Sequence, residues 1–274
     1  MIDGYKVVVC TPAGREKYLS ILSKHIKPNK LVDEWHLWLN TNKDRDINYI
    51  YSLADDKTKV IQRDDLNFNI DWQWNLHKFF DYCIEEDTIY IRIDDDVCYM
   101  RPDALENLLR FRIKMRGLFA VYGNVLNSTL NSFIQQRMGN VHTASGIAEY
   151  TTFDRTTLFL PSFAKKLHED IVTSIKANDT NKYLFGEWRL FGGEHHSIMV
   201  AAWFGSDLKK SSGMRADDEL SFSKMIPDEL GTHNTICGSA LFVHHSYLYQ
   251  RRELCVSEEE VDRTYLLHEY SNLI

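Results

Sequence analysis

Short apolar runs alternate with segments of helical spacing through the first 125 residues, and this alternation is the strongest constraint on the fold. Strands are predicted at residues 5–10, 34–40, 60–61 and 88–93. Helices are predicted at residues 15–26, 71–84 and 102–111. Strands that alternate with helices favour a parallel, doubly wound sheet, here over about residues 5–125.

The second half of the chain carries weaker signals. Helices are predicted at residues 161–177 and 258–270, and a strand at residues 239–245. No internal repeat or Pro-rich linker interrupts the 274 residues, a length that suits one large α/β domain. We therefore expect an α/β fold, a Rossmann-like sheet flanked by helices in a single compact domain, residues 1–274.

Composition excludes several classes of protein. Hydrophobic residues make up 44% and charged residues 26%, which argues against a disordered chain. The net charge of −7 argues against nucleic-acid binding. The five cysteines are scattered without a C-x-x-C, as in a reducing compartment. No signal peptide or transmembrane run of about 20 apolar residues is visible, so a soluble, cytoplasmic protein is expected.

Three consecutive aspartates follow the apolar run at residues 88–93 and are the most informative motif. Side chains alternate along a strand, so Asp94 and Asp96 share one face at its carboxyl end. Open α/β sheets bind ligands at that end, and two carboxylates held close together repel each other without a cation. Oxygen ligands of this kind suit Mg²⁺ or Mn²⁺. The alternative is a solvated acidic turn, as at residues 85–87 and 258–260.

Taken with its neighbours in the chain, this D-x-D resembles the metal-binding motif of GT-A glycosyltransferases. The segments that match are residues 7–15, 90–96, 217–219 and 238–245, in the family's order, and they resemble small soluble bacterial and viral members most. The resemblance implies a GT-A fold that binds the nucleotide through about residues 1–125 and the acceptor through about residues 126–274. It implies transfer of a sugar from a UDP-sugar donor to a hydroxyl of an oligosaccharide or glycan acceptor, in glycan biosynthesis.

The same resemblance implies the donor site. The nucleotide-sugar would contact Thr11, Pro12, Ala13, Gly14, Arg15, Arg63, Asp64, Arg92, Asp94 and Asp95. Mn²⁺ or Mg²⁺ would bind Asp94 and Asp96, with His244 or His245 as a further ligand, only one of which can face the ion if the strand is regular. The alternatives are purely structural roles: an ordinary strand-to-helix turn at residues 11–15, a surface ion pair at Arg92, and a buried, hydrogen-bonded histidine.

The resemblance also implies catalytic and acceptor residues. Asp218 is expected to be the base of an inverting transfer, with Asp217 and Glu219 behind it, although acids also suit a helix start electrostatically. Trp188, Glu194 and Trp203 are expected to contact the acceptor, because sugars stack on rings and hydrogen-bond to carboxylates. Core packing is the alternative for both tryptophans.

Two other functions compete with this one. A metal-dependent phosphohydrolase or nucleotidyltransferase could use the same aspartates, although Cys98 stands where a phosphatase D-x-D-x-T/V motif has Thr or Val. A non-catalytic carbohydrate-binding protein could retain the fold. The sequence does not distinguish glucose, galactose and xylose donors and does not indicate an oligomeric state.

Overall fold

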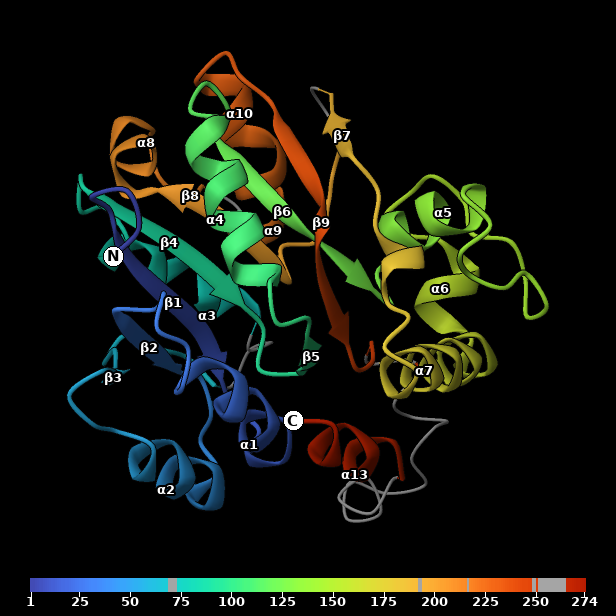
Figure 1. The fold of residues 1–274 in the computed structure, drawn as a ribbon. Coiled ribbons are helices and arrows are strands. Elements are labelled where there is room, and N and C mark those ends of the chain that lie inside the picture. The colour runs from blue at the N-terminus through green and yellow to red at the C-terminus, as the bar shows by residue number, and fades with distance from the viewer. Residues whose placement is uncertain (69–72, 192–193, 216, 248–249, 251–264) are drawn as a thin grey trace.

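A computed structural model describes residues 1–68, 73–191, 194–215, 217–247, 250 and 265–274 (Figure 1). In these ranges nine strands form one sheet. They are β1 (Lys6–Ala13), β2 (Glu34–Leu39), β3 (Thr58–Ile61), β4 (Thr88–Ile93), β5 (Val97–Met100), β6 (Ala120–Leu126), β7 (Glu187–Leu190), β8 (Val200–Phe204) and β9 (Asn234–His244).

The strand order is β3-β2-β1-β4-β8-β6-β9-β5, with β7 also paired to β9. The first four strands are parallel, as predicted, because a helical crossover connects each of them to the next. Within about residues 5–125, for which a parallel sheet is predicted, β5 is the exception, and antiparallel strands are added by the second half of the chain. β8 runs antiparallel between β4 and β6, and β5 and β7 run antiparallel to β9, so the sheet is mixed.

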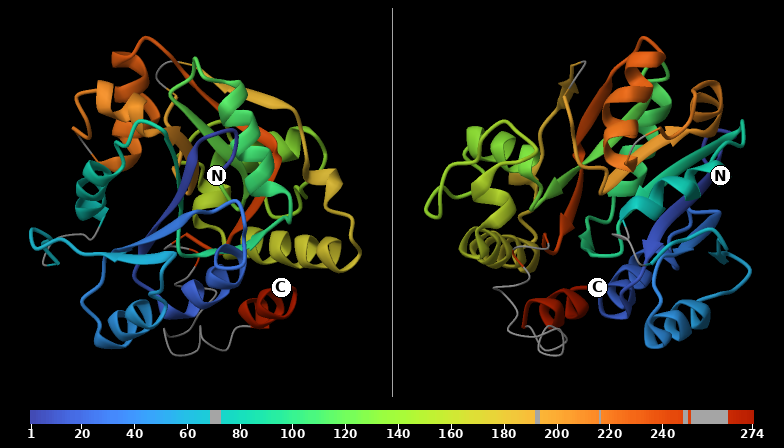
Figure 2. Two further views of the ribbon diagram at one scale, coloured as in Figure 1. Left: turned by 60° about the vertical axis from the view of Figure 1, so that its left-hand side comes forward. Right: turned by 180° about the vertical axis from the view of Figure 1, so that it is seen from behind.

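Helices cover both faces of the sheet (Figure 2). They are α1 (Glu16–Ile26), α2 (Asp44–Ser52), α3 (Gln73–Leu76), η1 (His77–Tyr82), α4 (Ala104–Lys114), α5 (Thr129–Arg137), α6 (Arg155–Phe159), α7 (Pro161–Lys176), η2 (Asn181–Tyr183), α8 (Gly205–Lys210), α9 (Asp218–Leu220), η3 (Ser221–Met225), α10 (Ile226–Glu229) and α13 (Tyr265–Asn272).

Alternating side chains of β1 enter two separate apolar clusters. Val7 and Val9 pack with residues of α1, α2 and α4 on one face. Val8 and Cys10 pack with residues of η1, α5 and η3 on the other. This period of two places β1 in the middle of three layers, helix, sheet and helix.

Two predicted helices differ from the structure. Residues 73–82 form the short α3 and then the 3₁₀ turn η1, rather than one helix over residues 71–84. At the C-terminus α13 spans Tyr265–Asn272, and residues 258–264 of the predicted helix lie outside the described residues. None of the described helices is both long and apolar enough to cross a membrane.

The topology creates one natural ligand position. From β1 the chain adds β2 and β3 on one side, then crosses back to place β4 on the other side of β1. The carboxyl ends of β1 and β4 therefore lie side by side at a topological switch point, where open α/β sheets bind ligands. Gly14 and Arg15 follow β1 there, and Asp94 to Asp96 follow β4.

Candidate functional site

The central aspartate of the motif fixes the loop after β1. Asp95 is buried, and its Oδ2 accepts a 3.1 Å hydrogen bond from the Gly14 backbone N–H. Its carboxylate also pairs with the Arg15 guanidinium, with Nε 3.1 Å from Oδ1. Burial raises the pKa of Asp95, and the positive charge of Arg15 opposes that rise. Asp95 thus supports the loop from behind.

The predicted nucleotide loop is shorter than expected. Thr11, Pro12 and Ala13 are buried residues of β1, paired with β2. The Thr11 hydroxyl accepts a 2.9 Å hydrogen bond from the Trp35 indole, so it is turned into the core. Pro12 does not break the strand. Only Gly14 and Arg15 form the loop, and a Cβ on Gly14 would lie 3.1 Å from the Asn40 carbonyl oxygen.

Arg92 joins the motif to the acidic run at residues 217–219. Its side chain is buried in β4, so the alternative of a surface ion pair does not apply. Nε donates to Asp94 Oδ1 at 2.9 Å, and Nη1 pairs with Asp218 Oδ2. Burial raises the pKa of Asp94 to about 6, against the attraction of Arg92 and with the repulsion of Asp96. One guanidinium thus pairs with two carboxylates that are far apart in the sequence.

Asp96 faces His244 at the end of β9. His244 Nδ1 lies 3.1 Å from the Asn127 carbonyl oxygen, which can only accept, so this bond assigns the ring proton to Nδ1. His244 Nε2 lies 3.3 Å from Asp96 Oδ2, and in the neutral ring it is a hydrogen-bond acceptor. Two acceptors at this separation repel each other unless a proton or a cation lies between them.

The Asp96–His244 pair fits a divalent cation. Metal-binding histidines commonly donate their second ring N–H to a backbone carbonyl, as His244 does. Adjacent ligands on one ion, each about 2.1 Å from it, lie about 3 Å apart. Among the described residues no three His, Cys, Asp or Glu side chains converge on one ion position. A cation here would therefore take two protein ligands and complete its shell with water and substrate oxygens.

The other predicted metal ligands are placed differently. The His245 side chain is turned to the opposite face, with its ring 5.1 Å from that of Tyr18 and 5.6 Å from that of His168. Its contribution near the site is the backbone N–H, which donates to the Asp96 carbonyl at 2.9 Å. Asp94 is engaged by Arg92. Alternation along the strand explains why only one histidine of the pair meets Asp96.

The acidic run forms the start of α9. Asp217 caps the helix, and its Oδ1 accepts from the Leu220 N–H at 2.8 Å. Asp218 has both oxygens engaged, one by Arg92 and one by the Glu219 N–H at 3.0 Å. The Glu219 side chain is 34% exposed, and its Oε2 lies 3.8 Å from His195 Nε2. Desolvation raises the pKa of Glu219, and the charge of Asp218 adds to that rise.

The remaining predicted contacts are dispersed. Arg63 pairs with Asp65 and Asp81 at the surface, and Asp64 is exposed beside it. Trp203 is fully buried and packs against Phe80 and Phe222, so its prediction as an acceptor contact is wrong and the core-packing alternative holds.

Trp188 and Glu194 lie near each other at the surface. Trp188 is partly exposed in β7, and its indole N–H donates to the Tyr150 hydroxyl at 3.3 Å. The Glu194 side chain hydrogen-bonds to the same hydroxyl.

Three residues beside the site were not identified from the sequence: Asn127, Tyr150 and His195. Asn127 has a left-handed φ of 61°, which Asn tolerates better than most residues, but no local pattern marks its carbonyl as the partner of His244.

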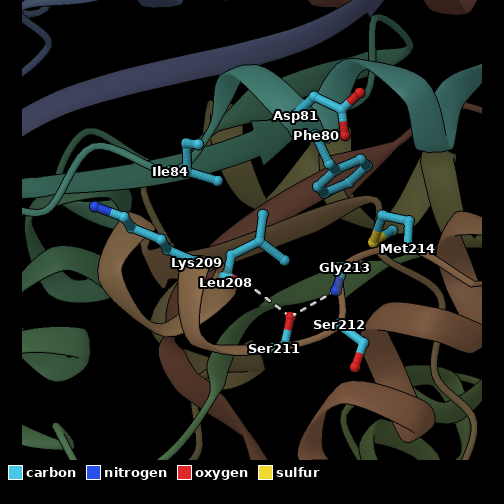
Figure 3. Close-up of a pocket in the computed structure, with 9 residues that line it drawn as sticks. All are labelled: Phe80, Asp81, Ile84, Leu208, Lys209, Ser211, Ser212, Gly213 and Met214. Atoms are coloured by element: carbon cyan, nitrogen blue, oxygen red, sulfur yellow. Dashed lines mark hydrogen bonds between the residues drawn. The ribbon is translucent and has the colours of Figure 1, made fainter.

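A surface pocket of about 320 Å³ lies elsewhere (Figure 3). Phe80, Ile84, Leu208 and Met214 form its apolar part. Ile84 precedes β4 and Leu208 follows the antiparallel β8, whereas Asp94 follows the other end of β4. None of the predicted site residues lines this pocket.

No family model and no curated protein matches the chain. Solved structures do. Glucosyl-3-phosphoglycerate synthase from Mycobacterium tuberculosis, in complex with Mn²⁺ and UDP-glucose, is 12% identical with a TM-score of 0.52, over 97% of this chain and 80% of that one. The same enzyme with phosphoglyceric acid gives a TM-score of 0.51 at 12% identity, over 98% and 81%.

A mycobacterial protein is also similar, at 13% identity and a TM-score of 0.50, over 89% of this chain and 68% of that one. At these identities the likeness concerns the arrangement of the chain. It agrees with the mixed sheet, the two helical layers and the switch point after β1 and β4. The chain therefore has the Rossmann-like α/β fold of GT-A enzymes.

Proposed function

We propose that this protein is a metal-dependent glycosyltransferase that moves a sugar from a UDP-sugar to a hydroxyl of a glycan acceptor, with inversion. The observation that carries the proposal is the Asp96–His244 pair. His244 Nε2 lies 3.3 Å from a carboxylate oxygen of the buried Asp96, at the point of the sheet where this fold binds ligands.

Asp96 and His244 would hold Mn²⁺ or Mg²⁺ next to the diphosphate of the donor. A divalent cation at this position supplies Lewis-acid stabilisation of the negative charge that the leaving diphosphate acquires. Arg15 Nη2 lies 3.0 Å from Asp96 Oδ2, so its positive charge is available to the same phosphate oxygens. The similar synthase that was solved with Mn²⁺ and UDP-glucose supports this assignment.

Arg92 organises the reacting centre. It holds Asp94 on the donor side and Asp218 on the side of α9, which fixes the start of α9 relative to β4. Because Arg92 and the Glu219 N–H engage both oxygens of Asp218, that carboxylate is poorly suited to accept a proton. Glu219 is more exposed, and its raised pKa brings it closer to the pH at which a general base works best. We assign Glu219 as the base and Asp218 as its positioning residue.

The site does not divide the chain at residue 125. Gly14, Arg15, Arg92 and Asp96 come from the first half, but His244 and the acids of α9 come from the second. The donor position is therefore built by both halves, and acceptor contacts are left to residues 126–274.

The experiment is an assay of UDP release from a panel of UDP-sugars, with oligosaccharide acceptors and Mn²⁺. Glu219→Gln should lower kcat by about 100-fold or more, the usual range for loss of a general base, while UDP binding stays within about twofold. The exposed Glu86→Gln is the matched control and should retain full activity.

Unaltered turnover in Glu219→Gln would exclude this base. UDP release that requires no acceptor, or pyrophosphate exchange, would support the phosphohydrolase or nucleotidyltransferase alternative instead.

A further inference from the structure

Four exposed or partly exposed aromatic side chains include one, Phe153, whose ring is linked to Glu219 through His195. Phe153 is 73% exposed, Phe191 69% and Tyr150 40%, and Trp188 is partly exposed. We call Tyr150, Phe153, Trp188 and Phe191 the aromatic platform. Single exposed apolar residues are common on protein surfaces, but clustered rings mark binding surfaces.

Direct contacts join the side chains of Tyr150 and Trp188. The Tyr150 ring lies 6.2 Å from that of Trp188, and the Trp188 indole N–H donates to the Tyr150 hydroxyl. Glu194 hydrogen-bonds to the Tyr150 hydroxyl, and its Oε2 accepts from the Phe191 N–H at 3.0 Å. The platform therefore has one linked pair of rings, Tyr150 and Trp188, with a hydroxyl and the Glu194 carboxylate beside it.

A second series of contacts joins the platform to the reacting centre. The Phe153 ring centroid lies 6.4 Å from that of His195, and His195 Nε2 lies 3.8 Å from Glu219 Oε2. Glu219 follows Asp218, which pairs with Arg92 and through it with Asp94. A molecule lying on Phe153 would thus extend from the position of the proposed base outward over the surface.

The chemistry of the platform selects its ligand. A sugar ring presents a flat face of C–H groups and a rim of hydroxyls, which match an exposed aromatic ring and adjacent polar side chains. The carboxylates of Glu194 and Glu219 would repel a phosphorylated or otherwise anionic acceptor. Phe153 and the Tyr150–Trp188 pair offer two separate stacking positions, so more than one sugar unit would be engaged.

We propose that the aromatic platform binds a neutral oligosaccharide of at least two sugar units as the acceptor, with Phe153 under the unit nearest Glu219. The role of this oligosaccharide as the acceptor rests on the proposed function. Its binding to the platform requires neither donor nor metal. The platform residues contact substrate and are binding residues, not part of the proton transfer.

The test is calorimetric titration of the full chain, without UDP or metal, with maltotetraose, cellotetraose, xylotetraose and chitotetraose and with the corresponding monosaccharides. At least one tetrasaccharide should bind about tenfold more tightly than its monosaccharide. Phe153→Ala and Trp188→Ala should each weaken that binding by about tenfold, the effect of losing one buried ring contact. Phe153→Tyr should restore it.

Tyr51→Ala, an exposed aromatic residue on α2, is the matched control and should bind as the unaltered chain does. Phe153 is exposed, so Phe153→Ala should keep the thermal stability of the unaltered chain. Absence of binding by all four tetrasaccharides, or equal binding by Phe153→Ala, would overturn the platform. If UDP still binds with Mn²⁺ in that case, the proposed function survives. If tetrasaccharides bind and UDP does not, the platform stands and the proposed function fails.

Discussion

Single residues at the switch point each contact more than one charged or polar partner. Arg92 pairs with both Asp94 and Asp218, and Asp218 is buried while Asp94 is partly exposed. Asp96 Oδ2 lies near His244 and Arg15 at once. Such shared contacts make the effects of substitutions here non-additive, because removing one side chain leaves two partners without compensation.

Arg92→Gln should lower the free energy of unfolding by about 3 kcal/mol, because it leaves two carboxylates in a protected site without their cation. Urea unfolding at pH 7 measures this. The control is Arg110→Gln, which removes an exposed ion pair on α4. It should change the free energy of unfolding by less than about 1 kcal/mol. A loss in Arg92→Gln no larger than that of the control would show that the buried ion pairs are not maintained in solution.

At the scale of single elements, the helices that could be predicted are those whose own residues show a clear periodicity. Residues 16–26 and 161–176 have clear helical periodicity and form α1 and α7 almost as predicted. The direction of β8 could not be predicted, because the short apolar run at residues 200–204 looks the same in a parallel or an antiparallel strand. No helix is predicted at residues 44–52, which form α2 with only Ile50 buried.

Helix α1 carries a histidine that makes stability depend on pH. Burial lowers the pKa of His25 to about 4 from its ordinary value of 6.5, and its Nε2 has no hydrogen-bond partner among the described residues. The folded pKa is below the unfolded one, so the unfolded chain binds the proton first as the pH falls. The stabilising effect of neutral His25 is therefore complete above pH 6.5 and is lost as the pH falls toward 4.

Between pH 7 and pH 5, the unaltered chain should lose up to about 2 kcal/mol of unfolding free energy more than His25→Phe does. Urea unfolding of both proteins at the two pH values measures the difference. The comparison isolates His25, because other groups such as His36, whose pKa is raised, titrate in both proteins. Parallel losses in the two proteins would contradict the assignment.

At the scale of the whole molecule, the site depends on contacts that no local pattern contains. The Asp94–Asp96 motif and its position at a strand end follow from the sequence. The orientation of His244 does not, because it depends on Asn127, 117 residues away. Similarly, Asp218 and Arg92 are 126 residues apart, and their pairing is what leaves Glu219 as the better base.

The C-terminal helix takes part in the same arrangement. Tyr270 of α13 hydrogen-bonds through its hydroxyl to His168 Nδ1 at 2.7 Å, and His168 Nε2 donates to the His245 carbonyl at 2.6 Å. This series of bonds connects α13 and α7 to the end of β9 that carries His244. The end of β9 that carries His244 is therefore held by α13 and α7 as well as by the sheet.

The most direct measurement is calorimetric titration with UDP, in Mn²⁺ and in EDTA, of the unaltered chain, Asp96→Asn, His244→Ala and the exposed controls Asp56→Asn and His268→Ala. We predict that Mn²⁺ strengthens UDP binding at least tenfold in the unaltered chain and both controls, and by less than twofold in the two site variants. UDP affinity that is the same with Mn²⁺ and EDTA, or metal dependence that persists without Asp96 and His244, would contradict the central claim.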